Sequence, residues 1–203
     1  QTQIKANNVR HATCSALANA FLVAKKPEPG TPPMATLSDL QNPDITDQHL
    51  QSAWRLILDL SNVSKACQDF NTCSVSPREI VNTFSRDKLC ITLDCLSYFH
   101  QICLDRSSQY LTAFSGCSPT SHYVSLRCPM GHAASCQIAT CILSLIFHGL
   151  IVPGDSFLYV DNVSLSTGLG WPALLELYEN ILKRCDIFNL TLKAKELNIG
   201  ISS

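Results

Sequence analysis

The stretch FLYVDNVSL, residues 157–165, decides the fold expected for this chain. Two β-favouring runs flank Asp161 and Asn162, residue types that tolerate the positive φ of a tight turn. The pattern predicts a β-hairpin with an acid at its apex. A second run, LCITLD at residues 89–94, is apolar and β-branched and ends in Asp94. It predicts a buried strand with a carboxylate at its tip.

Two helices are expected around the hairpin. Between residues 134 and 147 apolar side chains recur at helical spacing, and His148–Gly149 closes the run. From residue 172 to residue 188 apolar residues again share one face, with Pro172 suited to the first turn. Strands and helices follow one another without a regular βαβα alternation, so the predicted fold class is α+β.

The first part of the chain is expected to be rich in strands. Residues 20–24, AFLVA, and residues 54–60, WRLILDL, each predict a strand. Between them, residues 25–33 read KKPEPGTPP and a polar stretch continues to Gln51. Proline, glycine and polar residues in such density interrupt regular structure. We therefore expect a loop or insertion at residues 27–51.

Composition places the chain among packed globular proteins. Of its 203 residues 46% are hydrophobic and 15% charged, which excludes a disordered chain and indicates one domain, or two lobes sharing a core. The eleven cysteines include no C-x-x-C pair, so most are expected to be buried thiols in a reducing compartment. Without a secretory leader or an apolar run of about 20 residues, we expect an intracellular protein, cytoplasmic or nuclear, with no membrane partner.

Asp94 and Asp161 are the acids best placed to converge, because neighbouring strands of a sheet lie only about 4.8 Å apart. Two carboxylates held in this way can bind a pair of divalent cations, which activate an attacking hydroxyl and stabilise the leaving oxygen in phosphoryl transfer. Magnesium suits such hard oxygen ligands. The alternative is structural, since aspartates at strand ends are common turn and cap residues. The formal net charge of -1 argues against a chain that grips phosphates over its whole surface.

Five stretches occur in the order of a known family. Residues 91–114, ITLDCLSYFHQICLDRSSQYLTAF, resemble the first catalytic motif of retroviral and LTR-retrotransposon reverse transcriptases. Residues 127–136, RCPMGHAASC, resemble their Pro-x-Gly motif, and residues 157–165 resemble their Tyr-x-Asp-Asp hairpin. Residues 54–70 are similar to the fingers strand and turn of these enzymes, and residues 185–200 to a lysine-bearing turn.

This resemblance implies an RNA-directed DNA polymerase of a retroelement, a nucleotidyltransferase that extends a primer 3'-hydroxyl. The implied fold is a polymerase palm, with an antiparallel sheet backed by helices, and a β-rich fingers subdomain. Residues 1–86 would form the fingers and residues 87–203 the palm, with the return of residues 118–132 to the fingers left open. The implied partners are an RNA or DNA template with primer, deoxynucleoside triphosphates and further domains of a larger polyprotein. Thumb and RNase H regions are expected to lie outside this segment.

The resemblance also assigns roles to single residues. Asp94 and Asp161 would bind two Mg²⁺ (or Mn²⁺) ions. Phe99 would wall the nucleotide pocket against a ribose 2'-hydroxyl, while Lys25 and Arg55 would contact the incoming triphosphate. The positions carried over in full are the nucleotide-binding residues Lys25, Arg55, Phe99, Met130, Gly131 and Lys195, and the hairpin residues Tyr159, Val160, Asp161 and Asn162.

The sequence departs from this family at the hairpin. The second acid of the pair is Asn162, which offers a neutral oxygen to a cation and removes one negative charge, so magnesium affinity should fall. Met130, His132 and Cys136 also differ from the residues usual in the Pro-x-Gly motif. Two functions therefore stay open. One is a divergent polymerase, and the other is a catalytically inactive reverse-transcriptase-like remnant that serves as a nucleic-acid-binding or structural module.

Overall fold

The chain divides into two compact units, seen here in a computed structural model. The first unit is formed by Gln1–Gln68 and Cys103–Ala133, and the second by Asp69–Ile102 and Ala134–Ser203. The predicted insertion at 27–51 and the predicted boundary after residue 86 lie outside the described residues and stay predictions. The structure describes residues 7–14, 17–25, 54–67, 89–116, 120–152 and 155–201.

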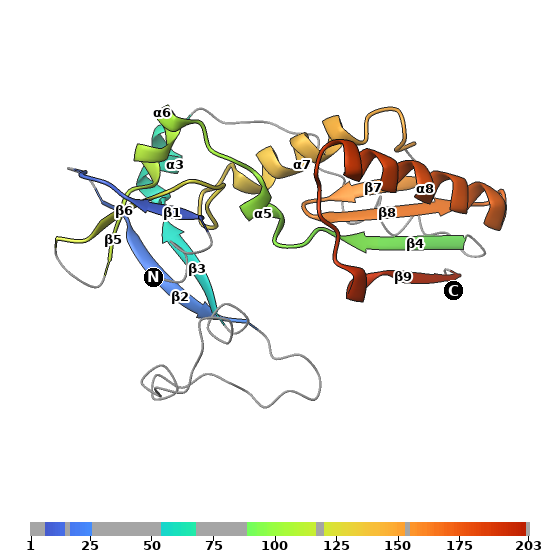
Figure 1. Cartoon of the computed structure of the whole chain (residues 1–203), viewed down its shortest axis with the longest axis horizontal. Helices are drawn as coiled ribbons and strands as arrows, with labels where there is room; N and C mark the ends of the chain where they lie inside the picture. The colour runs from blue at the N-terminus through green and yellow to red at the C-terminus, as the bar shows by residue number, and fades with distance from the viewer. Residues whose placement is uncertain are drawn as a thin grey trace. The chain divides into compact units, whose positions relative to one another are not determined.

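Two small sheets make up the strands of the first unit (Figure 1). Strand β6 (His122–Ser125) lies between β1 (Val9–His11) and β5 (Phe114–Ser115), antiparallel to both. Strands β2 (Asn19–Ala24) and β3 (Trp54–Asp59) form an antiparallel pair. The helical segments are α3 (Ser61–Ala66), α6 (Arg106–Gln109) and the 3-10 helix η2 (Tyr110–Thr112).

The core of the first unit is small. Val9, Leu58, Leu60 and Phe114 are buried together, and partly buried side chains such as Tyr123 pack against them. Strand β2 contributes little to this core, because its side chains from Phe21 to Ala24 are exposed. The predicted strands at 20–24 and 54–60 are both present, so the β-rich character expected of this part is confirmed for its described residues.

The second unit is built on one four-stranded antiparallel sheet (Figure 1). Its strand order is β7-β8-β4-β9, so the two acid-bearing segments meet in the middle of the sheet. The strands are β7 (Ser156–Tyr159), β8 (Asn162–Thr167), β4 (Leu89–Asp94) and β9 (Asn198–Ile201). The helices are α5 (Tyr98–Gln101), α7 (Ser135–Ile146), α8 (Trp171–Ile187) and the 3-10 helix η3 (Ala194–Glu196).

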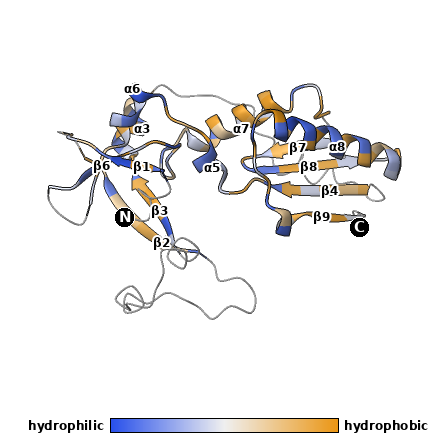
Figure 2. Cartoon of the chain, in the orientation of Figure 1, coloured by the Kyte–Doolittle hydropathy of each residue, from blue (hydrophilic) through white to orange (hydrophobic). Residues whose placement is uncertain are grey.

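Helices α7 and α8 pack on one face of this sheet. Side chains alternate along a strand, so Ile91 of β4 and Val163 of β8 face the helices and are fully buried. Leu143 of α7 and Leu174 of α8 join the same core. Hydropathy colouring shows α8 as an amphipathic helix, with hydrophilic and hydrophobic residues on different sides (Figure 2). The polar residues at the strand ends lie on the opposite face of the sheet.

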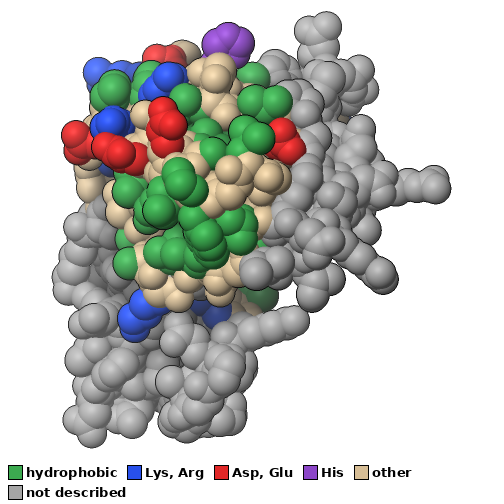
Figure 3. Space-filling model, turned by 90° about the vertical axis from the view of Figure 1, so that its right-hand side faces the viewer, with side chains coloured by type: hydrophobic (Ala, Val, Ile, Leu, Met, Phe, Trp, Pro, Cys, Tyr) green, Lys and Arg blue, Asp and Glu red, His purple; other side chains and the backbone are tan. Residues whose placement is uncertain are grey.

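The α+β fold class is confirmed by this arrangement. The helices predicted at 134–147 and 172–188 are present as α7 and α8, and the strand predicted at 89–94 is β4. Among the described residues no helix combines the length and the apolar character needed to span a bilayer. Some apolar side chains remain on the surface, and Figure 3 shows them gathered beside acidic and basic side chains.

The cysteines differ from the expectation. Nine are described and all are free thiols, but only Cys95, Cys128 and Cys185 are buried. The prediction that most are buried is therefore wrong for the described residues. Leaving a small thiol partly exposed to water costs little free energy. The number of cysteines therefore does not predict how many of them are buried.

Burial makes a testable difference in thiol reactivity. Desolvation raises the pKa of Cys95 to about 12 and that of Cys185 to about 11. The thiolate is the reactive form, so both groups stay protonated and unreactive at about pH 8. Iodoacetamide labelling followed by mass spectrometry should modify the exposed Cys67 and Cys103 at least about ten-fold faster. Equal labelling rates in the folded protein would contradict this burial pattern.

Candidate active site

A two-residue turn places Asp161 at the tip of the β7-β8 hairpin. Tyr159 of β7 pairs with Asn162 of β8, which leaves Val160 and Asp161 as the turn. The hairpin with an acid at its apex is confirmed. The prediction that Asp161 and Asn162 adopt a positive φ is wrong. Val160 adopts φ 56 instead. The register makes Val160 the first turn residue, and a β-branched residue in this conformation is strained.

Asp94 and Asp161 lie at the adjoining ends of neighbouring strands. Asp94 is paired in register with Asn162, the residue that follows Asp161. The Cys95 N–H donates to the Asp161 carbonyl oxygen at 2.9 Å, which fixes the turn against the end of β4. The pKa of the Cys95 thiol is raised, mainly because the thiol is buried. The neighbouring Cys185 and the charges of Asp161 and Asp94 raise it further. The two acids are therefore neighbours through the backbone at this end of the sheet.

Asn162 contacts the neighbouring carboxylate directly. Its Nδ2 group donates to Oδ1 of Asp161 at 3.3 Å, and both residues are half-buried. A second carboxylate here would repel Asp161, whereas the amide donor stabilises it. An asparagine in place of an aspartate at residue 162 thus removes one negative charge, and its amide donates a hydrogen bond to one oxygen of Asp161.

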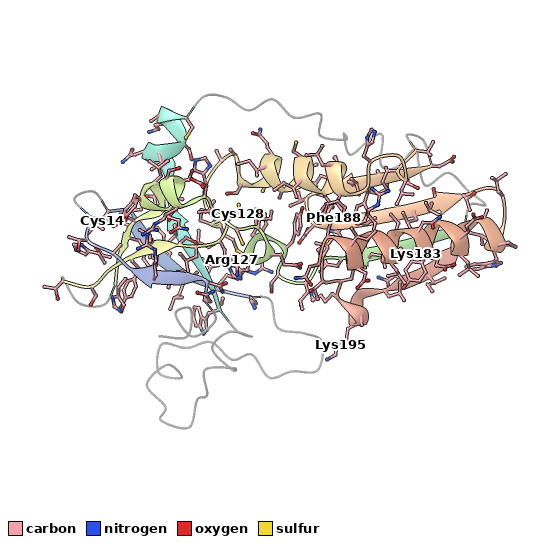
Figure 4. All side chains as sticks on the ribbon, turned by 45° about the horizontal axis from the view of Figure 1, so that its top comes forward. Cys14, Arg127, Cys128, Lys183, Phe188 and Lys195 are labelled. Atoms are coloured by element: carbon pink, nitrogen blue, oxygen red, sulfur yellow. The ribbon has the colours of Figure 1, made fainter. Side chains whose placement is uncertain are left out.

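Lys193 forms an ion pair with the other acid. Its Nζ lies 3.5 Å from Oδ2 of Asp94, and its backbone N–H donates to the Asp94 carbonyl oxygen at 2.8 Å. Sequence reasoning missed this residue and assigned Lys195, from the same turn, to nucleotide binding, which stays a prediction. Lys195 is exposed on η3, and Figure 4 shows its side chain extending away from the sheet. Only the backbone pairing of this segment with β4 distinguishes the two lysines.

Gln101 holds the segment that carries Lys193. Its Nε2 donates to the carbonyl oxygens of Leu96 at 2.6 Å and Thr191 at 3.0 Å, while its Oε1 accepts from the Thr191 N–H at 2.8 Å. The Leu96 N–H also donates to the Thr191 carbonyl oxygen at 2.9 Å. The sequence flagged Gln101 only as part of a motif. Its role depends on a segment about 90 residues away and carries no local signature.

Phe99 lies close to this end of the sheet, on the short helix α5. It is half-buried and packs against the main core, with its ring centroid 6.4 Å from that of Tyr98. The Tyr98 hydroxyl donates to the Ala139 carbonyl oxygen at 2.9 Å and so anchors α5 to α7. A role of Phe99 in the nucleotide pocket stays a prediction.

The remaining predicted residues belong to the first unit. Lys25 directly follows β2, and Arg55 is an exposed residue of β3 paired with Val23, so both lie at the same end of this strand pair. The Leu58 N–H donates to the Met130 carbonyl oxygen at 2.9 Å, which packs the Met130 turn on β3. Their place in a fingers motif and their contacts with a nucleotide stay predictions.

Gly131 is required by the close approach of this turn to β3. It has φ +110, and a Cβ built on it would lie 1.9 Å from the Leu58 carbonyl oxygen. Both the conformation and the space exclude a side chain. The neighbouring His132 is partly buried, which lowers its pKa, and its Nε2 lies 3.6 Å from Sγ of Cys67.

Comparison with known proteins follows from these motifs and this fold. No protein-family model matches the chain. Its sequence is 28% identical over 139 residues to the Retrovirus-related Pol polyprotein from transposon 412 of Drosophila melanogaster, an alignment covering 68% of this chain and 11% of that protein. The foamy viral protease-reverse transcriptase in complex with double-stranded DNA superposes with a TM-score of 0.74 at 20% identity, over 98% of this chain and 30% of that one.

The chain has the fold of this reverse-transcriptase structure and is similar in sequence to a retroelement Pol polyprotein. The foamy viral protein in complex with an RNA/DNA hybrid gives a TM-score of 0.71 at 20% identity, over 97% of this chain and 22% of that one. The resemblance read from the motifs is confirmed at the level of fold and of similarity to a retroelement Pol protein. The domain spans only about a tenth of that Pol polyprotein.

The donor groups at this end of the sheet are of the type that divalent cations accept. Asp94 and Asp161 supply carboxylate oxygens at adjoining strand ends, and Asn162 supplies a neutral amide oxygen beside them. The charge is low for this purpose, because Asn162 is neutral. The described residues contain no group of three His, Cys, Asp or Glu side chains that could hold a metal ion. The residues therefore fit a divalent cation in kind, with a weakened negative field.

Proposed function

We propose that this domain is the RNA-directed DNA polymerase domain of a retroelement. The observation that carries the proposal is the meeting of Asp94 and Asp161 at adjoining strand ends, fixed by the 2.9 Å hydrogen bond from Cys95 to Asp161. The reaction would be nucleotidyl transfer to a primer 3'-hydroxyl. Similarity to a Pol polyprotein and to the foamy viral fold supports this reaction class.

Asp94 and Asp161 are the proposed metal ligands, with Asn162 as a neutral third position. Two Mg²⁺ (or Mn²⁺) ions bound there would supply activation of the primer hydroxyl and stabilisation of the leaving oxygen. The protein contributes the placement of the two carboxylates. The hairpin register and the main-chain hydrogen bond from Cys95 fix that placement before any ligand arrives.

The nucleotide-binding roles are proposed from the motif positions. Lys25 and Arg55 would bind the triphosphate from the end of the β2-β3 pair, where a guanidinium can grip two phosphate oxygens. Phe99 would exclude a ribose 2'-hydroxyl. The remaining proposed contacts, on the Pro-x-Gly turn and the lysine turn, are Met130, Gly131 and Lys195.

Nucleic-acid binding is supported by an uneven distribution of charge. In its described part the first unit has more basic than acidic residues, whereas the second unit has the reverse balance. A basic fingers unit matches a partner made of phosphates, such as an RNA or DNA template with its primer. The foamy viral protein was solved with double-stranded DNA and with an RNA/DNA hybrid. The described basic residues of the first unit are Arg10, Lys25, Arg55, Lys65, Arg106 and Arg127, against Asp59 and Asp105.

Two features favour a second candidate function, a catalytically inactive domain kept for nucleic-acid binding or as a structural part of a larger polyprotein. Asn162 removes one acid, and Lys193 pairs with Asp94. Together they lower the negative charge that a metal ion requires. In either case we propose an intracellular location, because the template would be found there.

The substitution Asn162→Asp separates the two functions. In the polymerase it restores a charge beside Asp161, so primer extension in Mg²⁺ should rise several-fold or more. The unaltered protein should be relatively more active in Mn²⁺, which tolerates a less ideal ligand set. Primer extension with the domain in its natural polyprotein frame measures both effects. Absence of extension in Mn²⁺ and in Asn162→Asp, with the protein folded, would establish the inactive alternative.

A further inference from the structure

We propose that Lys193 is a built-in counter-ion of the candidate metal site, one that competes with a divalent cation for Asp94. The proposal rests on the assignment of Asp94 and Asp161 as metal ligands in the proposed function. It explains what the lysine does there and predicts a metal affinity lower than the two carboxylates alone would give.

The contact that carries the proposal is the ion pair at Asp94. Nζ of Lys193 lies 3.5 Å from Oδ2 of Asp94, and the Asp94 side chain is only 16% exposed against 38% for Lys193. The Asp94 carboxylate is therefore largely withdrawn from water. A partly buried pair is screened less by salt than a pair on the open surface.

The position of Lys193 is fixed by its backbone. Its N–H donates to the Asp94 carbonyl oxygen at 2.8 Å, so the lysine starts next to the acid whose side chain it meets. Leu192 forms an antiparallel bridge with Cys95, and Thr191 is held by Gln101. The ammonium group therefore reaches Asp94 from an anchored segment of backbone.

Other lysines described in the second unit lie in different surroundings. Lys183 of α8 pairs with Glu179 one helical turn away at 2.9 Å, with both side chains well exposed. Figure 4 shows Lys183 on α8 and Lys195 on the turn before β9. Lys183 thus offers a matched control, because it also forms a lysine–carboxylate pair and its loss changes the net charge equally.

The electrostatic consequence is a reduced field for a cation. Asp94 and Asp161 supply two negative charges, Asn162 is neutral, and Lys193 cancels one of the two. A divalent ion at Asp94 must displace the ammonium group or bind beside it. Either process weakens the binding of the divalent ion. The loss of affinity is roughly ten-fold if the ammonium group and the ion lie about 4 Å apart in a medium with the dielectric constant of water.

The test is Mn²⁺ binding to the whole chain, measured from the electron paramagnetic resonance signal of free Mn²⁺. Lys193→Met, which keeps the aliphatic stem and removes the charge, should bind Mn²⁺ about ten-fold more tightly than the unaltered protein. Lys193→Arg keeps the positive charge, so it should bind Mn²⁺ as weakly as the unaltered protein does. Lys183→Met should change the Mn²⁺ affinity by less than about two-fold. Lys193→Gln serves as a second uncharged variant if circular dichroism shows that Lys193→Met is unfolded.

Unchanged or weaker Mn²⁺ binding in a folded uncharged variant would overturn the proposal. Primer extension on the same proteins keeps the polymerase proposal separate. Tighter Mn²⁺ binding without any extension supports the counter-ion and counts against the polymerase. Extension with equal Mn²⁺ affinity in both proteins supports the polymerase and rejects the counter-ion.

Discussion

Asp94→Asn is expected to abolish primer extension, with a loss of about a thousand-fold or more, while the chain stays folded. The amide keeps the size of the side chain at the end of β4 and removes the charge that a cation requires. Asp94 and Asp161 are the acids that meet there, and Asn162 cannot replace the lost charge. Primer extension and a melting curve of the same preparation measure the two halves of this prediction.

The stability of Asp94→Asn should change little. The pair with Lys193 is partly exposed and long, so its loss costs less than about 1 kcal/mol. Asp186→Asn, at an exposed position near the end of α8, is the control for a change of one charge in the same unit. Extension retained in Asp94→Asn, or an unfolded protein, would mean that Asp94 has a structural role and the site lies elsewhere.

Gly131→Ala is expected to destabilise the first unit by about 3 kcal/mol or more. The new Cβ would meet the Leu58 carbonyl oxygen at 1.9 Å, and this backbone atom cannot move without disturbing β3. The φ of +110 adds conformational strain for any residue with a side chain. Chemical denaturation, followed by circular dichroism, measures the loss in the free energy of unfolding.

Two other glycines separate crowding from strain. Gly149 has φ +80 with nothing within 4 Å of a built Cβ, so Gly149→Ala should cost only the strain, about 1 to 2 kcal/mol. Gly168 has open space and no positive φ, and Gly168→Ala should be nearly neutral. Equal losses in Gly131→Ala and Gly149→Ala would show that the Met130–Gly131 turn does not approach β3 as described.

The elements of the second unit were predictable from the sequence because their information is local. A run of β-branched residues ending in Asp94 gave β4, and helical spacing of apolar residues gave α7 and α8. The hairpin was also predictable, but its turn was assigned to Asp161 and Asn162. The register moved the turn by one residue, onto Val160 and Asp161. Residue type indicates which residues tolerate a positive φ. The pairing between the two strands decides which residue adopts it.

The contacts around the candidate site were less predictable because they join distant segments. Lys193 and Lys195 stand in the same turn, and only the bridge between Leu192 and Cys95 shows which lysine meets Asp94. The need for glycine at residue 131 was visible as a turn preference. Its close approach to Leu58 was not, since that depends on how the turn packs on β3.

The hydrogen bonds of Gln101 bear on how this domain can change over evolutionary time. They bind main-chain groups of Leu96 and Thr191, so substitutions at those two positions leave the acceptor carbonyls in place. This geometry therefore depends on the side chain of residue 101 and not on the side chains of residues 96 and 191. The side chain of Lys193 contributes nothing to these bonds, and a lysine codon becomes an uncharged one by a single nucleotide change. One mutational step can thus remove the positive charge from the candidate site without loosening the segment that carries it.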